Sequence, residues 1–289
     1  MTGVRSLFKK NKPIFSSIYI FAVMLLLYAP ILVLFIFSFN ESGNLGSFTG
    51  FSVKWYRELF RDSTAFTALK NTLLLALESS LLATVIGTFA ALGIYRMQNK
   101  YLKTTVTSVT NIPMMNPDIV TGVSMMLFFV AVAGMFNFSS ALGKTTMLIA
   151  HTTFNLPYVI LSVLPRFKQM DKSLTEAALD LGCTPAKAFF KVELPYVVPG
   201  IVSGAMLGFT LSLDDFVISH FVSSPDFQTL PLYIYNQTAH NVKFSMYALC
   251  SLIIAAILFL MLAINFIGAK SDNTSPKQTK TEQRKLAKH

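Results

Sequence analysis

The stretch IFSSIYIFAVMLLLYAPILVLFIFSF, residues 14–39, contains no charged side chain. It is longer than the roughly 20 apolar residues that a helix needs to cross the hydrocarbon core of a bilayer. A cleavable signal peptide has an apolar core of only about 7–15 residues and a small-residue cleavage site, and neither feature fits here. The stretch therefore predicts a retained membrane-spanning helix.

The composition of the whole chain also indicates a membrane protein. Of its 289 residues, 53% are hydrophobic and 13% are charged, whereas about 25% of the residues in a typical soluble domain are charged. These charges are too few to cover a water-facing surface, so we expect extensive contact with membrane lipid. The net charge of +10 then indicates membrane orientation and anionic lipid rather than nucleic acid.

Five further apolar segments predict an all-α membrane protein with six transmembrane helices. Helix is the expected form of each span, because lipid offers no hydrogen-bond partner to an open backbone. Pro113 and Pro117 interrupt the third segment. Together the spans form one predicted domain over residues 14–269. The predicted spans are 14–39, 71–95, 104–135, 145–164, 196–221 and 244–269.

Lysine and arginine are unevenly distributed between the two ends of these spans. If the N-terminus lies in the cytoplasm, three quarters of the 24 lysine and arginine residues lie on the cytoplasmic side, as the positive-inside rule requires. Six spans then return the C-terminus to the cytoplasm. We therefore predict a basic cytoplasmic N-terminus over residues 1–13. The basic tail over residues 270–289 has little to bury and is predicted to be disordered.

The longest predicted cytoplasmic loop carries the sequence signals of two short helices. Asp171 or Ser173 can cap the start of the first, and Gly182 can end it in a left-handed conformation. Thr184 and Pro185 suit the N-cap and the first position of the second. These signals predict a helix–turn–helix outside the membrane. An ordinary interfacial loop is the alternative that composition alone leaves open.

Residues with the chemistry of an enzyme are scarce. The four histidines and two cysteines are scattered and do not form a metal site. The GKT sequence at 143–145 lacks the upstream glycine of a phosphate-binding loop. His151, in the fourth predicted span, is assigned no chemistry. We predict a non-catalytic protein with no catalytic residue, no metal and no cofactor in this chain.

Four carboxylates lie inside predicted spans and are the candidates for a substrate pathway: Glu78, Asp118, Asp214 and Asp215. A charged residue at the centre of a span costs about 2.5–3.5 kcal/mol on insertion scales. Such side chains should therefore face protein, water or a passing cation. For Glu78 and Asp118, pairing with polar neighbours in the bundle is the alternative interpretation.

The two adjacent carboxylates differ in their surroundings on a continuous helix. Consecutive positions point about 100° apart, so Asp214 and Asp215 face different directions. Asp215 shares its face with Gly208, Ser212 and Ser219, a small and polar stripe that suits a water-lined pathway. We therefore predict Asp215 on the pathway, with Asp214 orienting it or pairing across helices.

Part of the predicted cytoplasmic loop 165–195 reads EAALDLGCTPAKAFFKVELP, residues 176–195. Its order is E-A-A, three residues, G, nine residues, V, one residue, L-P. This pattern resembles the EAA motif of ABC-importer permeases and departs from it only by valine in place of isoleucine. The resemblance implies a type I ABC importer permease architecture, in which the coupling loop binds a cytoplasmic ATPase dimer that hydrolyses ATP. The implied contact residues are Glu176, Ala177, Ala178 and Gly182.

Four other phrases narrow the resemblance to the PotC-type permeases of spermidine/putrescine importers. They are GFSVKWYRELF at 50–60, NPDIV at 116–120, LSLDDFVISHFV at 211–222 and TLPLYIY at 229–235. The similarity implies a bacterial inner-membrane permease that works with a second homologous permease subunit and a periplasmic polyamine-binding protein. The alternatives are an ABC importer of another small solute, a secondary cation transporter and a structural assembly subunit.

Overall fold

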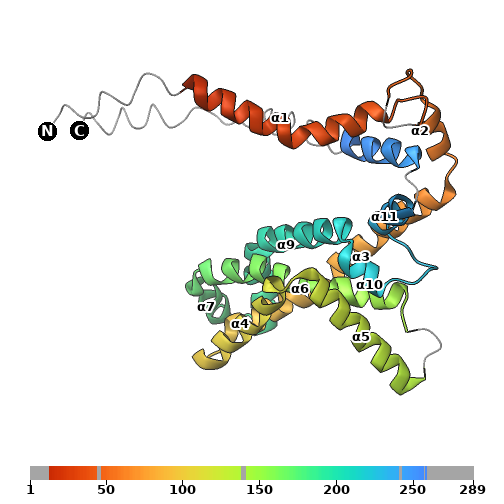
Figure 1. Cartoon of the computed structure of the whole chain (residues 1–289). Coiled ribbons are helices and arrows are strands. Elements are labelled where there is room, and N and C mark those ends of the chain that lie inside the picture. The colour runs from red at the N-terminus through yellow and green to blue at the C-terminus, as the bar shows by residue number, and fades with distance from the viewer. Residues whose placement is uncertain (1–12, 44–46, 138–140, 241–242, 257, 259–289) are drawn as a thin grey trace, which may run out of the picture. The chain divides into compact units, whose positions relative to one another are not determined.

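The computed structural model describes residues 13–43, 47–137, 141–240, 243–256 and 258, and these are mostly helical (Figure 1). Within these residues, five helices are long and apolar enough to cross a membrane, and a shorter apolar helix spans Phe244–Ala256. This confirms the predicted all-α membrane class. The helices are α1 (Pro13–Phe37), α2 (Lys54–Leu59), α3 (Ser63–Arg96), α4 (Lys100–Met115), α5 (Asp118–Phe136), α6 (Lys144–Gln169), α7 (Lys172–Asp180), α8 (Pro185–Ala188), the π-helix η1 (Phe189–Glu193), α9 (Leu194–Asp214), α10 (Val217–Val222) and α11 (Leu230–His240).

The first, second and fourth predicted spans are confirmed as the helices α1, α3 and α6. Most of the two basic terminal segments, and the end of the sixth predicted span, lie outside the described residues. The count of six spans and the cytoplasmic placement of both termini therefore stay predictions. Contacts divide the chain into two compact units: Met1–Asp62 with His240–His289, and Ser63–Ala239.

In the first unit, α1 presents apolar side chains to its surroundings on every side. No residue of its most apolar window is buried, and Leu26 is 75% exposed. A helix that is apolar all round is typical of contact with lipid. The Tyr56 hydroxyl of α2 lies 2.8 Å from Ser38 Oγ and 2.6 Å from Ser251 Oγ. Tyr56 thereby ties the end of α1 to the helix Phe244–Ala256.

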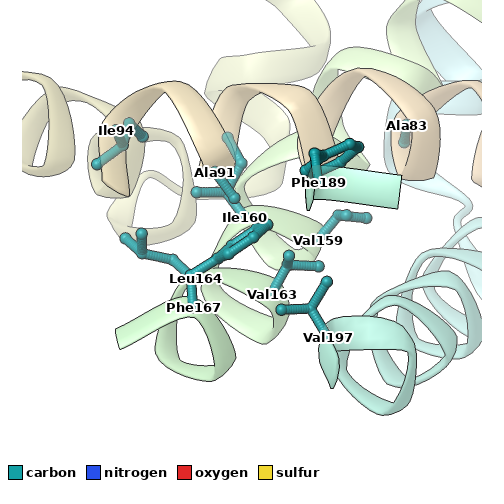
Figure 2. Close-up of a cluster of buried hydrophobic side chains, with 10 residues drawn as sticks. All are labelled: Ala83, Ala91, Ile94, Val159, Ile160, Val163, Leu164, Phe167, Phe189 and Val197. Atoms are coloured by element: carbon teal, nitrogen blue, oxygen red, sulfur yellow. The ribbon is translucent and has the colours of Figure 1, made fainter. Parts of the chain in front are cut away.

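In the second unit, α3, α6 and α9 pack against one another around an apolar core (Figure 2). Phe167 of α6 is fully buried, and its ring stacks on Tyr95 of α3 with 5.5 Å between centroids. Phe189 adds a buried ring from η1 to the same core. The buried members of the cluster are Ala83, Ala91, Ile94, Val159, Ile160, Val163, Leu164, Phe167, Phe189 and Val197.

Glycines allow the three long helices to approach closely. A Cβ atom on Gly87 of α3 would lie 2.7 Å from Val159 Cγ1. On α9, a Cβ on Gly200 would lie 2.9 Å from the backbone oxygen of Ser162, and one on Gly204 would lie 3.2 Å from Val159 Cα. Small residues at such spacing are typical of helix contacts inside membranes. The stripe on α9 therefore positions α6.

The third predicted span is wrong as a single helix, because the chain breaks between α4 and α5. Asn116 is extended (φ −77°, ψ 142°), as expected for a residue that precedes proline. Pro117 has no N–H to continue the ladder, and α5 begins at Asp118. Pro113, by contrast, lies inside α4.

The fifth predicted span differs at both ends. Helix runs without interruption from Pro185 through η1 into α9, so the predicted start at 196 is too late. At the other end α9 stops at Asp214, Asp215 is extended (φ −63°, ψ 119°), and α10 starts at Val217. The continuous helix expected through Ser219 is therefore wrong.

The two broken spans contact each other through α5 and α10. A Cβ on Gly122 of α5 would lie 3.0 Å from Phe221 Cδ2 and 3.4 Å from the backbone oxygen of Val217. Non-helical backbone at membrane depth is tolerated where it is buried in protein or lines an aqueous cavity. Discontinuous helices also form the substrate sites of many transporters. The region of the two breaks is therefore a candidate functional region.

Candidate functional site

The predicted coupling loop follows α6 directly and consists of two short, capped helices. The Asp171 carboxylate accepts a hydrogen bond from the Ser173 N–H at 3.0 Å, and this bond holds the pKa of Asp171 below its ordinary value. Gly182 has φ +84°, in the left-handed region. Thr184 Oγ1 accepts from the Lys187 N–H at 3.4 Å. The capping and turn signals of the sequence are confirmed.

The four residues implied as ATPase contacts do not all face outward. Glu176, Ala177 and Gly182 are exposed, whereas Ala178 is 9% exposed and packs inward. Leu181, beside them, is 87% exposed. The contact with an ATPase itself stays a prediction.

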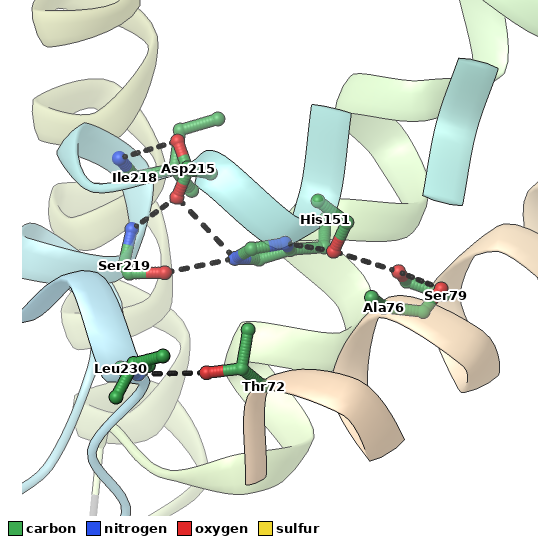
Figure 3. Close-up of polar contacts among 9 residues, drawn as sticks. Thr72, Ala76, Ser79, His151, Asp215, Ile218, Ser219 and Leu230 are labelled. Carbon is green, nitrogen blue, oxygen red and sulfur yellow. Dashed lines mark hydrogen bonds and ion pairs between the residues drawn. The ribbon is translucent and has the colours of Figure 1, made fainter. Parts of the chain in front are cut away.

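A buried polar cluster joins α3, α6, α9 and the break before α10 (Figure 3). His151 is 1% exposed, and its Nδ1 lies 2.6 Å from Ser212 Oγ. Its Nε2 lies 3.1 Å from Ser219 Oγ and 3.5 Å from Asp215 Oδ2. Ser79 donates to Ser212 Oγ at 3.1 Å. We name these five residues the His151 cluster.

One arrangement of protons satisfies the imidazole in this cluster. Ser79 donates to Ser212, so the Ser212 hydroxyl can donate its own proton to His151 Nδ1. Nε2 then carries the ring proton and points it toward Ser219 Oγ and the Asp215 carboxylate. In this neutral tautomer both ring nitrogens have partners.

Asp215 closes the break between α9 and α10. Its Oδ1 accepts from the Ile218 N–H at 3.2 Å and its Oδ2 from the Ser219 N–H at 2.8 Å. The carboxylate is only 7% exposed. Gly208 and Ser212, expected beside it on a water-lined stripe, are buried, with Gly208 against Asn155 of α6.

The other three carboxylates have different surroundings. Glu78 Oε1 forms an ion pair with Lys144 Nζ at 3.0 Å, and the two side chains are 36% and 47% exposed, so Glu78 has a charged partner outside the buried core. Asp118 and Asp214 are exposed at the start of α5 and at the end of α9. Three of the four carboxylates thus lie at the two helix breaks, and Glu78 lies on α3.

Sequence reasoning missed His151 as the centre of the buried cluster. A signal existed, because an ionisable residue inside a span is a functional candidate by default. The predicted polar stripe also contained two of its partners, Ser212 and Ser219. Nothing in the sequence, however, indicates that α6 brings the imidazole to that stripe.

Residues 83–270 match the family described as binding-protein-dependent transport system inner membrane component. The putrescine transport system permease protein PotI of Escherichia coli (strain K12) is 38% identical over 251 residues, which cover 86% of this chain and 89% of that protein. The spermidine/putrescine transport system permease protein PotC of Haemophilus influenzae is 36% identical over 255 residues, which cover 88% and 96%.

Solved structures of ABC transporters share the fold. A chain of a bacterial transporter that imports alginate superposes with a TM-score of 0.71 at 16% identity, covering 91% of this chain and 96% of that one. A chain of the inward-facing MetNI methionine transporter gives 0.56 at 21% identity, covering 76% and 96%. The match over residues 83–270 and the relatives that align with most of the chain lead to one conclusion: this protein belongs to the binding-protein-dependent transport system inner membrane components, the non-catalytic permease subunits of ABC importers.

Proposed function

We propose that this chain is a permease subunit of an ATP-driven polyamine importer in a bacterial inner membrane. The observation that carries the proposal is its identity of 38% and 36% to permeases named for putrescine and spermidine/putrescine transport. Membership of a binding-protein-dependent family argues against a secondary cation transporter and a structural assembly subunit. An importer of another small solute is the alternative that the experiment below separates.

The partners follow from the same proposal. The coupling loop would bind a cytoplasmic ATPase dimer, a second permease would complete the pathway, and a periplasmic binding protein would deliver the polyamine. Exposed Glu176, Ala177 and Gly182, beside exposed Leu174 and Leu181, support the ATPase contact. The fold supports the periplasmic partner, because one similar structure is an alginate transporter in complex with a ligand-bound periplasmic protein.

The helix breaks supply acceptors that suit a polyamine. Such a molecule carries ammonium groups along an apolar stem and needs separated carboxylates with apolar or aromatic walls. Asp118 and Asp214 are exposed at helix ends, so we assign the cation contact to them. Asp215 already accepts hydrogen bonds from two backbone N–H groups, so its role is to stabilise the start of α10 after the helix break. Glu78 has Lys144 as its partner.

The test is uptake of radiolabelled putrescine and spermidine by cells that lack their own polyamine importers. The chain is expressed with its ATPase, paired permease and binding protein. Glu176→Arg is expected to abolish uptake at normal membrane levels, because it reverses the charge at the ATPase contact. Asp214→Asn is expected to slow uptake about tenfold, the loss of one charge-assisted contact.

Two controls define the outcomes. Asp226→Asn removes an exposed carboxylate outside the helix breaks and should leave uptake unchanged. Asp215→Asn keeps one acceptor for the backbone N–H groups but turns an amide N–H toward the other, so it should lower the unfolding temperature, and uptake should fall only in proportion to the folded permease. Uptake of a different solute in place of polyamine would show that the proposed substrate is wrong. Polyamine uptake without the ATPase would show that the protein is not part of an ATP-driven importer.

A further inference from the structure

An ion pair joins the end of α3 to the segment that leads out of the coupling loop. Arg96, the last residue of α3, places Nη2 3.1 Å from Oε1 and 3.0 Å from Oε2 of Glu193. The Glu193 side chain is only 3% exposed, while that of Arg96 is 47% exposed. A carboxylate so deeply buried requires a charged partner, and Arg96 provides it.

The same carboxylate also faces the coupling helix α7. Thr175 Oγ1 lies 3.5 Å from Glu193 Oε1, a long and weak contact. Thr175 immediately precedes Glu176, the first residue of the proposed ATPase contact. Glu193 therefore lies between the coupling helix on one side and the end of α3 on the other.

Glu193 belongs to the π-helix η1, between α8 and α9. Short π segments are rare and are frequent at functional positions. Phe189, at the start of η1, is 6% exposed, and its ring centroid lies 6.4 Å from that of Phe89 on α3. One end of η1 thus contacts α3 through an apolar side chain and the other end through a charge.

These two kinds of contact respond differently to movement. Helix is continuous from Pro185 to Asp214, so a displacement of the loop reaches α9 through the backbone. The same displacement reaches α3 only through side-chain contacts. Apolar contacts are non-directional and allow packed helices to slide. In the Arg96–Glu193 pair, one guanidinium nitrogen contacts both carboxylate oxygens. Such a charge-assisted hydrogen bond weakens as its atoms move apart, so it opposes sliding.

We propose that Arg96 and Glu193, with Thr175, link the coupling loop to α3, so that α3 and α9 move together when the ATPase drives the loop. This inference rests on the proposed function. Arg96 and Glu193 are positioning residues, since they act through the helices and contact neither nucleotide nor solute. Loss of the link should leave ATP hydrolysis running with less solute moved.

The experiment uses the complete importer in proteoliposomes, with ATP hydrolysis and polyamine uptake measured on one preparation. In Arg96→Gln and in Glu193→Gln, uptake per ATP should fall at least about fivefold, the lower end of typical coupling between sites. Hydrolysis per assembled complex should stay within about twofold of the wild type. Lys100→Gln is the matched control, because it removes an exposed positive charge near the same end of α3.

A charge swap distinguishes loss of the Arg96–Glu193 contact from a general loss of structure. The double variant R96E/E193R restores opposite charges and should recover uptake per ATP relative to either reversal alone. An unchanged ratio in Arg96→Gln and Glu193→Gln would overturn the inference. So would a loss of assembled complex in proportion to uptake in every variant, which would assign the pair to assembly. If the wild-type complex moves no polyamine, the proposed function fails instead.

Discussion

The coupling loop and the His151 cluster are both polar regions of an apolar chain, yet they are built in opposite ways. The loop is a local structure in which Asp171, Gly182 and Thr184 act on residues two or three positions away. The cluster is assembled by packing, and His151 meets Ser212 across 61 positions of the sequence.

This difference predicts different consequences of mutation. A loop stabilised by its own caps can change its surface without disturbing the bundle, so its variants should affect coupling before stability. A cluster held by helix packing cannot change without affecting the fold, because buried polar groups that lose partners are costly. The predictions below test this contrast from the largest expected effect to the smallest.

The largest loss of stability is expected where α6 and α9 pack most closely. Gly200→Ala would place a Cβ atom 2.9 Å from the backbone oxygen of Ser162, which cannot move alone, and 2.7 Å from Arg166 Cγ. Overpacking of this kind costs about 1–3 kcal/mol. We expect a lower thermal unfolding temperature and less assembled permease, measured in detergent extracts.

Gly208→Ala is the matched control on the same helix. The nearest atoms to its new Cβ are those of Asn155 at 3.5 Å, an ordinary contact. Alanine also favours helix over glycine by about 0.5–1 kcal/mol, so Gly208→Ala should be neutral or slightly stabilising. Equal unfolding temperatures for the two variants would show that α6 and α9 are not tightly packed.

The second largest loss of stability is expected from a substitution in the His151 cluster itself. His151→Ala removes the partner of the Ser212 and Ser219 hydroxyls and the Nε2–H that faces Asp215. Hydrogen bonds between helices in membranes average about 0.6 kcal/mol each, so we expect a loss of about 1–2 kcal/mol in unfolding free energy. The measurement is the thermal unfolding temperature of the same extracts.

Thr153→Ala is the control for His151→Ala, because Thr153 lies on the exposed side of α6. Its hydroxyl donates to the Ile149 backbone oxygen, one turn earlier in the same helix, at 2.8 Å. An unfolding temperature that falls with Thr153→Ala and not with His151→Ala would contradict the role given to the cluster.

The same contrast explains how much could be predicted from the sequence. Caps and turns depend on neighbouring residues, so Asp171, Gly182 and Thr184 were predictable and are confirmed. The break at Pro117 had a local signal, although Pro113 carries the same signal and stays helical. Proline weakens a helix, and the tertiary surroundings decide whether the helix stops there.

The break at Asp215 was not predicted because neither glycine nor proline marks it. An aspartate can cap a new helix, but it does so here where Ser219 and His151 also meet its carboxylate. That environment comes from α6 and cannot be inferred from α9 alone. The exposure of Asp118 and Asp214 depends in the same way on where the helices stop.

The smallest effect is expected in the coupling loop, as a local change in amide exchange. This change should depend on pH. Asp171→Ala removes the acceptor of the Ser173 N–H, so amides in the first turn of α7 should exchange with deuterium several-fold faster at neutral pH. Asp171→Asn keeps an acceptor and should exchange like the wild type. Neither substitution should change the unfolding temperature, because the cap acts only on its own helix.

Acid should separate the wild type from Asp171→Asn. The hydrogen bond lowers the pKa of Asp171 below its ordinary value of 3.8, so the carboxylate stabilises α7 fully above that value. This stabilisation is lost as the pH falls through the lower, folded pKa. The ratio of exchange rates between the two proteins cancels the intrinsic effect of acid. It should rise only at that low pH, and a constant ratio would mean that the charge of Asp171 contributes nothing to the cap.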